Sequence, residues 1–215
     1  MKRCVIFGAA PNADVCGVQV DPGALVLCAD GGLYLARQLG LTPDLLLGDF
    51  DSCPPALANG LPHVTFPVRK DDTDLMLAVR YGIQAGCQDF TIYGALGGRL
   101  DHTLAAISVL GFLLDRGLSG RLVNGKTCVQ LLGCGEHRLS STGGYLSLFP
   151  FGCDQVSVLL SGTTYDGSVQ LTASFPLGVS NEFAAKTARI TVLPGEGECR
   201  VLAVICEKDT PKTPA

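Results

Sequence analysis

Short apolar runs alternate with amphipathic stretches along the first 125 residues of the chain. The apolar runs predict strands at residues 3–8, 24–29, 44–48, 63–66, 89–94 and 121–124. Apolar residues that recur every three to four positions predict helices at 31–40, 73–86 and 102–116. In the last of these helices, the predicted buried stripe consists of Leu104, Ile107, Leu110 and Leu114. Strands that alternate with helices are typical of a mostly parallel α/β sheet.

The pattern changes after Asn124-Gly125. From there on, turns separate short β-like runs at residues 127–132, 145–149, 156–160, 168–173, 188–193 and 200–206. Regularly spaced short strands with turn signals favour a β-sandwich or a small barrel. We therefore predict a Rossmann-like α/β domain at residues 1–125, an all-β sandwich domain at 126–208 and a flexible polar tail at 209–215.

Composition and charge narrow the classes of protein that the chain can represent. Its 215 residues are 47% hydrophobic and 17% charged, so the chain can bury a substantial core. The net charge of −4 argues against a nucleic-acid-binding surface, which is normally basic. Ten cysteines without a Cys-x-x-Cys pair predict reduced thiols in a cytoplasmic protein. No apolar run is long enough to span a membrane, so no membrane association is expected.

Aspartates stand where the predicted strands end. Asp30 follows the strand at 24–29, Asp49 and Asp51 follow the strand at 44–48, and Asp101 follows the strand at 89–94 after a glycine-rich bend. The carboxyl ends of parallel strands share one edge of a sheet, where ligands bind. Two like charges about 4 Å apart near a surface repel by roughly 4 kcal/mol, so gathered carboxylates indicate a cation among them. Oxygen ligands favour Mg²⁺ or Ca²⁺, and Mg²⁺ usually accompanies phosphates.

The segment Gly48-Asp49-Phe50-Asp51-Ser52 carries two of these carboxylates. In extended backbone, residues two apart face the same way, so Asp49 and Asp51 can contact one ion while Phe50 points toward the core. The alternative is a turn at a strand end with solvated aspartates.

The segment Lys70-Asp71-Asp72-Thr73-Asp74 opens the predicted helix at 73–86. Asp and Thr are ordinary helix N-caps, and acidic residues suit a first helical turn. Capping alone does not need three acids in four residues, and the positive end of a helix also favours phosphate. Both interpretations stay open for this segment.

The segment Gly97-Gly98-Arg99-Leu100-Asp101-His102 joins a strand to a helix. Two glycines allow a backbone to approach a phosphate closely, and an arginine fork can bind its oxygens. The alternative is a tight connection in which Asp101 caps the helix and His102 is simply a residue of its first turn. The chain has no dinucleotide-binding Gly-x-Gly-x-x-Gly after Asp30 and no P-loop sequence.

Together these segments resemble the thiamine pyrophosphokinase family. Residues 29–32, Pro43-Asp44 with 48–52, 71–74, and Gly94 with 97–102 agree with that family in order and spacing. Residues 162–165 and 180–183 are similar to the family's substrate-binding strands. The resemblance implies an α/β catalytic domain followed by a β-sandwich. It also implies a homodimer with shared active sites, in which thiamine lies between the sandwich of one subunit and the catalytic domain of the other.

The resemblance also implies roles for individual residues, which are predictions here. Mg²⁺ is expected at Asp49, Asp51 and Asp74, which with Arg99 and Asp101 form the predicted catalytic set. The predicted ATP-binding residues are Asp30, Lys70, Asp71, Thr73, Gly97, Gly98, Arg99 and His102. The predicted thiamine-binding residues are Tyr165, Ser180 and Asn181.

The implied reaction is the transfer of the pyrophosphoryl group of ATP to the hydroxyethyl group of thiamine, which gives thiamine diphosphate and AMP. The alternatives are a pyrophosphokinase for another hydroxymethyl heterocycle, such as a reduced pterin, and a non-catalytic sensor of nucleotide or thiamine. The chain departs from the family in having no tryptophan to stack on thiamine, so Tyr165 is the predicted aromatic. It also has Thr163-Thr164 where the family tends to have an apolar and a basic residue.

Overall fold

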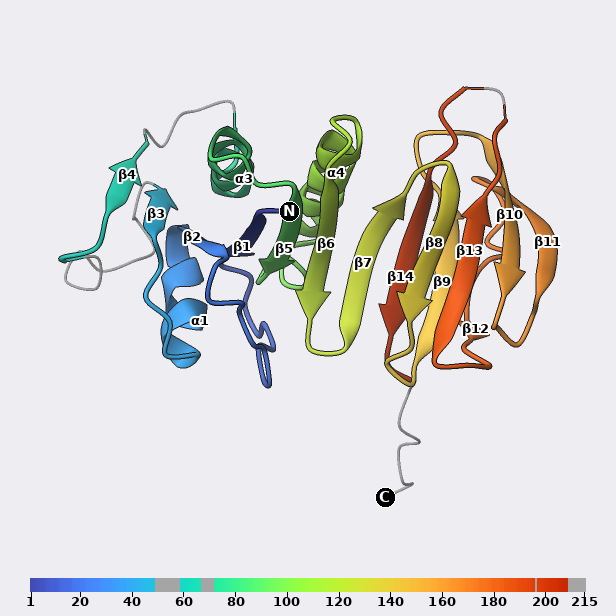
Figure 1. Cartoon of the computed structure of the whole chain (residues 1–215), viewed down its shortest axis with the longest axis horizontal. Helices are drawn as coiled ribbons and strands as arrows, with labels where there is room; N and C mark the ends of the chain where they lie inside the picture. The colour runs from blue at the N-terminus through green and yellow to red at the C-terminus, as the bar shows by residue number, and fades with distance from the viewer. Residues whose placement is uncertain (49–58, 67–71, 196, 209–215) are drawn as a thin grey trace, which may run out of the picture. The chain divides into compact units, whose positions relative to one another are not determined.

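The computed structural model describes residues 1–48, 59–66, 72–195 and 197–208 of the chain. The chain divides into two compact units, Met1–Gly125 and Lys126–Ala215 (Figure 1). The protein is a mixed α/β protein in which strands predominate, and this confirms the predicted fold class at that level. Within the described residues, no helix combines the length and the apolar character that crossing a membrane requires.

The first unit contains a parallel sheet with helices packed against it. In spatial order its strands are β6 (Ser119–Asn124), β5 (Asp89–Tyr93), β1 (Arg3–Phe7), β2 (Leu25–Ala29), β3 (Leu45–Gly48) and β4 (His63–Thr65). The helical elements are the 3-10 turn η1 (Asp30–Gly32) and the helices α1 (Leu33–Gln38), α3 (Asp74–Gln84) and α4 (Leu100–Leu114). The strand pairs in this sheet are all parallel, as the alternating pattern predicts.

The order of the strands reverses between β1 and β5. From β1 the chain builds the sheet through β2, β3 and β4, and it then returns to the other side of β1 to add β5 and β6. Backbone hydrogen bonds between the β1 and β5 segments continue beyond the ends of these two strands. The Gly8 N–H donates to the Tyr93 carbonyl at 2.8 Å and the Ala10 N–H to the Gly94 carbonyl at 2.8 Å. A reversal of this kind opens a crevice at the carboxyl ends of the strands.

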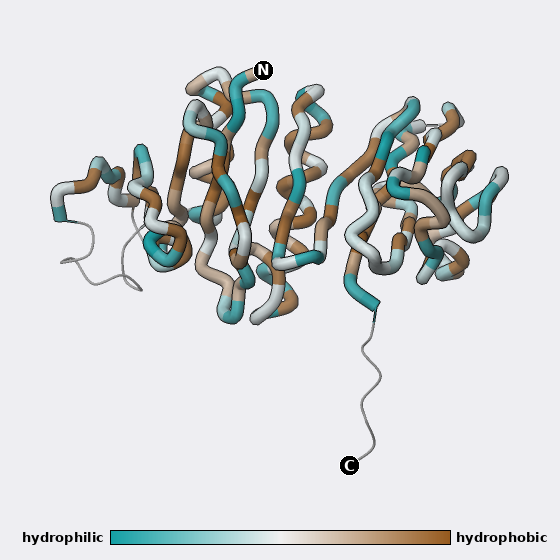
Figure 2. The backbone as a smooth tube through the Cα atoms, turned by 60° about the horizontal axis from the view of Figure 1, so that its bottom comes forward, coloured by the Kyte–Doolittle hydropathy of each residue, from teal (hydrophilic) through white to brown (hydrophobic). Residues whose placement is uncertain are grey.

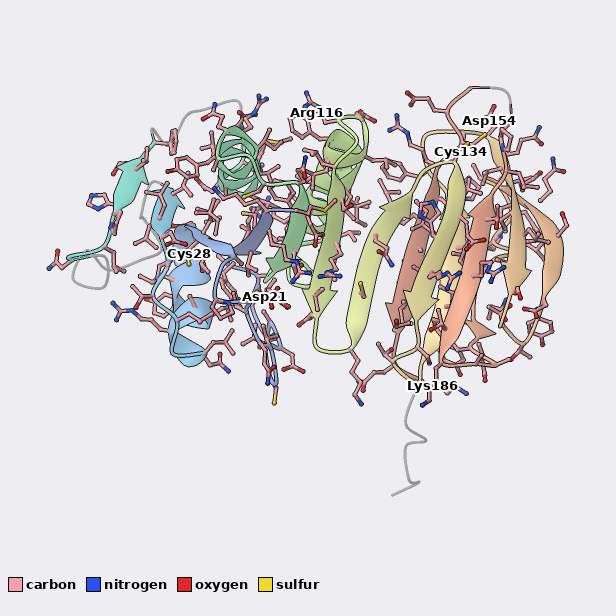
Figure 3. All side chains as sticks on the ribbon, viewed as in Figure 1. Asp21, Cys28, Arg116, Cys134, Asp154 and Lys186 are labelled. Carbon is pink, nitrogen blue, oxygen red and sulfur yellow. The ribbon has the colours of Figure 1, made fainter. Side chains whose placement is uncertain are left out.

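Hydrophobic stretches, brown in Figure 2, alternate with hydrophilic ones along the backbone. The strands β1, β2 and β3 are almost continuously buried, which is expected where helices cover a parallel sheet. Cys28, labelled in Figure 3, is buried in β2 and packs there as a small hydrophobe. The ring of Phe7 at the end of β1 stacks on Tyr93 at the end of β5, with 5.5 Å between ring centroids.

The buried face of α4 differs from the predicted one. Leu104 is 56% exposed, so its assignment to the buried stripe was wrong. The buried residues are Ala106, Val109, Leu110, Gly111 and Leu113. The reason lies in β6, where Gly120 has no side chain. A Cβ atom built on Gly120 would lie 2.6 Å from Leu113 Cδ1 and 3.1 Å from Leu110 Cδ2, so these two leucines occupy the space above the glycine and set the rotation of the helix.

The second unit contains two antiparallel sheets. One has the order β12 (Asn181–Glu182), β9 (Tyr145–Pro150), β14 (Val201–Cys206) and β7 (Thr127–Leu132). The other has the order β11 (Gly167–Thr172), β10 (Gln155–Ser161), β13 (Thr187–Val192) and β8 (Gly135–Ser140). Buried residues from both sheets form one hydrophobic core.

Two strands of the second unit, β8 and β12, were missing from the sequence prediction. The strand β8 lies at the edge of its sheet, and only Leu139 is buried in it, so its sequence carries no alternating apolar pattern. The strand β12 has only two residues, which is too short for any periodicity.

Gly32 should tolerate no side chain. A Cβ atom at this position would lie 1.9 Å from the carbonyl oxygen of Phe7, because η1 packs directly on the end of β1. We expect Gly32→Ala to lower the free energy of unfolding by roughly 1–3 kcal/mol or more. In Gly23→Ala, the matched control, the new Cβ meets nothing within 4 Å, and we expect a change within about 0.5 kcal/mol. Urea unfolding measures both, and equal midpoints would contradict the packing described.

Candidate active site

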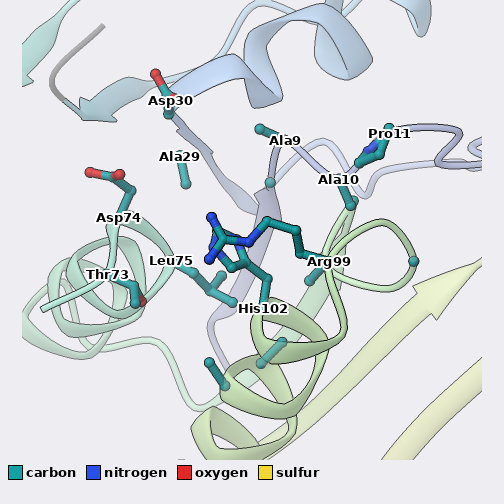
Figure 4. A pocket seen from close by; sticks show the side chains of 16 residues that line it. Ala9, Ala10, Pro11, Ala29, Asp30, Thr73, Asp74, Leu75, Arg99 and His102 are labelled. Carbon is teal, nitrogen blue, oxygen red and sulfur yellow. The ribbon is translucent and has the colours of Figure 1, made fainter. Parts of the chain in front are cut away.

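A cavity of about 610 Å³ lies at the carboxyl ends of β1, β2 and β5, where the strand order reverses (Figure 4). Its walls come from four places in the first unit. They are the segment 8–11 after β1, the end of β2 at Ala29 and Asp30, the start of α3 at 73–75, and the loop after β5 with the first turns of α4. Crevices at such reversals are the usual ligand sites of open α/β sheets.

The segment Gly8-Ala9-Ala10-Pro11 forms one wall and was not among the predicted site residues. It passes very close to the loop after β5, since a Cβ atom on Gly94 would lie 2.4 Å from the Gly8 carbonyl oxygen. The signal that identifies this wall is the run of small residues directly after the first strand. At the carboxyl edge of a parallel sheet, small residues leave room for a ligand.

Two carboxylates occupy one side of the cavity, Asp30 and Asp74 (Figure 4). Asp30 has a φ of 48°, in the left-handed region that residues other than glycine seldom adopt. Backbone strain of this kind often accompanies functional residues. Gly48, the last residue of β3, packs against it, because a Cβ atom there would lie 3.1 Å from the Asp30 Cα atom.

Asp74 is the first residue of α3, and Thr73 is the N-cap of that helix. The Thr73 Oγ1 atom accepts a hydrogen bond from the Met76 N–H at 3.2 Å, so the capping interpretation of Thr73 is correct. Both residues also line the cavity, so the positive end of the helix dipole is directed at its contents. Asp72 lies apart from this group and forms an ion pair with Arg80 at 3.0 Å.

The side chains of Arg99 and His102 enter the cavity opposite the two carboxylates (Figure 4). Asp101 binds the Arg99 guanidinium in a bidentate fork, with Nε to Oδ1 at 3.1 Å and Nη2 to Oδ2 at 2.6 Å. Asp101 Oδ1 also accepts from the His102 backbone N–H at 3.0 Å. The fork holds the pKa of the Asp101 carboxyl below its usual range and raises the pKa of Arg99. An exposed guanidinium is thereby held, charged, at the mouth of the cavity.

Gly97 and Gly98 shape the loop that carries Arg99. Both have positive φ, 92° and 69°, so other residues would be strained there. Gly97 lines the cavity. Gly98 packs on the wall formed by residues 8–11, since a Cβ atom on it would lie 2.7 Å from Pro11 Cδ. The structure therefore places the two glycines in different roles, one facing the cavity and one joining the two loops.

Four predicted site residues, Asp49, Asp51, Lys70 and Asp71, lie outside the described residues. Their roles stay predictions. Two of the three predicted metal ligands are among them, and within the part of the chain that the structure describes, no group of three or more His, Cys, Asp or Glu side chains is placed to hold a metal ion.

The second unit brings the three predicted thiamine-binding residues together. The Asn181 Oδ1 atom accepts from the Tyr165 N–H at 3.1 Å, and Ser180 precedes Asn181 with a φ of 61°. Tyr165 lies in the turn between β10 and β11 and is 73% exposed, so its ring is not part of the hydrophobic core of this unit. Thr163, by contrast, is only 3% exposed, so its departure from the family pattern lies in a buried position.

The fold and the cavity are those of an α/β protein with a candidate ligand site at the reversal point of a parallel sheet. The sequence model of the family described as "Thiamin pyrophosphokinase, catalytic domain" matches residues 20–119. Thiamine pyrophosphokinase from Bacillus subtilis (strain 168) is 29% identical over 199 residues, which are 85% of this chain and 90% of that protein. By these two comparisons the chain is similar to the thiamine pyrophosphokinases, and the match to the family model lies within the first unit.

Solved structures show that the fold is shared along nearly the whole chain. The thiamine pyrophosphokinase structure from Bacillus subtilis superposes with a TM-score of 0.85 at 24% identity and covers 96% of this chain and 100% of that one. The corresponding structure from Geobacillus thermodenitrificans gives a TM-score of 0.82 at 20% identity, with 98% and 99% covered. The enzyme from Candida albicans gives 0.73 at 16% identity, with 95% and 90% covered.

Proposed function

We propose that this protein transfers the pyrophosphoryl group of ATP to the hydroxyethyl oxygen of thiamine and releases AMP. The match of residues 20–119 to the family model supports this reaction, as does the similar protein from Bacillus subtilis that is named thiamine pyrophosphokinase. The observation that carries the proposal is the cavity at the sheet reversal, where the carboxylates of Asp30 and Asp74 lie opposite the guanidinium of Arg99. Neither a pterin pyrophosphokinase nor a non-catalytic sensor finds support in the comparisons.

The two units would have different functions in this reaction. We assign residues 1–125 to a Rossmann-like domain that binds ATP and performs the transfer, and residues 126–208 to a β-sandwich that binds thiamine. The predicted tail at 209–215 lies outside the described residues. The division of the chain at Gly125 supports this assignment. The single core shared by two antiparallel sheets in the second unit supports the sandwich.

Phosphoryl-type transfer depends mainly on positioning and on neutralising charge. The Arg99 fork suits phosphate oxygens, and Asp101 holds it at the mouth of the cavity before the nucleotide arrives. The N-terminus of α3 would contribute backbone N–H groups and the positive end of its dipole. Gly97, Gly98 and His102 complete the proposed nucleotide site, with Lys70 and Asp71 from the preceding segment.

The residues of the site fit a hard divalent cation. The described acidic groups of the cavity, Asp30 and Asp74, offer carboxylate oxygens, which are the ligands that Mg²⁺ prefers. We assign Mg²⁺ to Asp49, Asp51 and Asp74, where it would offset the negative charge of the bound phosphates. Asp30 would lie beside that group.

Thiamine is proposed to bind at Tyr165, Ser180 and Asn181, in a homodimer that shares its active sites between subunits. The clustering of these three residues in the second unit supports a common binding surface. The cytoplasmic location stays a prediction from the cysteine usage of the chain.

An assay of nucleotide products tests the proposed reaction. The purified protein with ATP and Mg²⁺ should form AMP with thiamine, and much less with thiamine monophosphate or a hydroxymethylpterin. ADP as the nucleotide product, or a preference for the pterin, would overturn the assignment.

Tyr165 should contribute to thiamine affinity through its ring. A cationic ring over an aromatic face gains about 0.5–2 kcal/mol, which corresponds to roughly 2- to 30-fold in affinity. We therefore expect Tyr165→Ala to raise the KM for thiamine several-fold and to leave the KM for ATP nearly unchanged. Tyr165→Phe keeps the ring and serves as the matched control, with a small effect. Equal changes in both KM values would contradict a thiamine contact.

A further inference from the structure

The turn between β10 and β11 presents an exposed aromatic ring on a tightly bonded backbone. Tyr165 is 73% exposed, whereas Thr163, two residues earlier, is 3% exposed. The ladder of the hairpin already runs from Gln155 paired with Thr172 to Leu160 paired with Gly167. The additional hydrogen bonds described below therefore act on the turn itself and are not needed to hold the two strands together.

Asp166 closes the turn from one side. Its Oδ1 atom accepts from the Thr163 N–H at 2.8 Å and lies 2.9 Å from the Thr163 hydroxyl, while its Oδ2 atom accepts from the Gly162 N–H at 3.2 Å. These bonds from Thr163 and then Gly162 hold the pKa of the Asp166 carboxyl below its usual range. The carboxylate therefore stays charged and keeps its acceptors available at neutral pH.

Asn181 holds the turn from the other side, and both atoms of its amide are used. Its Oδ1 atom accepts from the N–H groups of Tyr165 at 3.1 Å and Glu182 at 2.8 Å. Its Nδ2 atom donates to the Tyr165 carbonyl at 3.2 Å. Two N–H donors face the amide oxygen and one carbonyl faces the amide nitrogen. A flipped amide would lose all three of these hydrogen bonds.

An aromatic ring on a preorganised backbone binds a ligand at a lower entropic cost than the same ring on a mobile loop. The two side chains fix the backbone on both sides of Tyr165 but leave its ring exposed. Their carboxylate and amide are already engaged with the backbone, so they are suited to act on thiamine through Tyr165.

We propose that Asp166 and Asn181 are positioning residues for thiamine, which hold the Tyr165 ring in its binding orientation. This rests on the proposed function, and it adds Asp166 to the thiamine site and gives Asn181 an indirect role. We call the side chains of Asp166 and Asn181 the clamp. If the clamp acts on thiamine affinity through the Tyr165 ring, its loss should have little effect on that affinity in a variant that lacks the ring.

A double-mutant cycle on the full-length chain tests this interdependence. Thiamine affinity is measured by calorimetry with an ATP analogue that has a methylene group between the α- and β-phosphorus. We expect Asp166→Asn, which places a donor against an N–H group, to raise the Kd for thiamine roughly two- to tenfold, the effect of losing one or two hydrogen bonds. In the Tyr165→Ala variant, adding Asp166→Asn should raise the Kd for thiamine by less than about twofold.

Asn181→Asp provides a second, nearly isosteric variant, which removes the donor to the Tyr165 carbonyl and should show the same non-additivity. Asp154→Asn is the matched control, since it removes the same charge at the opposite end of β10 and should leave thiamine affinity unchanged. Additive effects in the cycle, unchanged affinity in both clamp variants, or an equal loss of affinity for the ATP analogue would overturn the proposal. Absence of thiamine binding by the unmodified protein would also overturn it. Thiamine binding without AMP formation from ATP would refute the proposed reaction alone.

Discussion

Replacement of Asp74 with asparagine is expected to reduce turnover at least about tenfold while the protein stays folded. Asp74 is the first residue of α3, and its carboxylate lies in the cavity opposite Arg99. The substitution removes one negative charge at the position where we assign a metal ligand and keeps the shape of the side chain. The Thr73 hydroxyl still caps the helix, so the loss of stability should be small.

Asp72→Asn is the matched control for this prediction. Asp72 lies two residues before Asp74, but it pairs with Arg80 at 3.0 Å and does not line the cavity. It should therefore retain near-normal turnover. Steady-state kinetics with thermal unfolding of both variants makes the comparison. Equal turnover in the two variants would show that Asp74 is only a residue of the first helical turn.

Replacement of Arg99 with alanine is expected to reduce turnover by about 100-fold, the usual cost of losing one preorganised group that stabilises a transition state. Arg99→Lys keeps the positive charge but loses the planar fork, so its turnover should fall between those of alanine and the unmodified protein. The unfolding temperature of both variants should change little, because the Arg99–Asp101 pair is exposed.

Arg116→Lys is a control just beyond the C-terminal end of the same helix. Arg116, labelled in Figure 3, follows the last residue of α4 by two positions and does not line the cavity; its guanidinium lies 3.5 Å from the centroid of the Phe112 ring and donates to the Phe112 carbonyl. Its replacement should leave turnover unchanged. If Arg99→Lys and Arg116→Lys behave alike, the fork of Arg99 has no part in the reaction.

The fold could be predicted from the sequence where local pattern and burial agree. Central strands such as β1 and β2 are buried on both faces, so their apolar runs mark them clearly. The spacing of apolar residues gave the wrong result where tertiary packing decides which face of a helix is buried. Leu104 fits the helical period of α4 but is exposed, because the helix is seated on Gly120 through Leu110 and Leu113.

The candidate site could be predicted in part, because the rule for parallel sheets brings strand ends together. That rule and the family resemblance together led to Asp30, Thr73, Asp74, Gly97, Arg99 and His102, and the structure places all six around one cavity. The wall at residues 8–11 was missed because glycine and alanine carry no functional group. Its position is recognisable only once β1 is known to lie at the point where the strand order reverses. The clamp of Asp166 on Thr163 was also missed, since hydrogen bonds within a turn leave no periodic signal.

The most direct test of the central claim follows the two transferable phosphates of ATP separately. In parallel reactions with thiamine and Mg²⁺, ATP carries a radioactive label at either the β- or the γ-phosphorus, and the label in thiamine diphosphate is counted. Transfer of an intact pyrophosphoryl group predicts that both labels enter the product in equal amounts, with one AMP formed for each thiamine diphosphate. Entry of the γ label alone, accompanied by ADP, would contradict the proposed reaction.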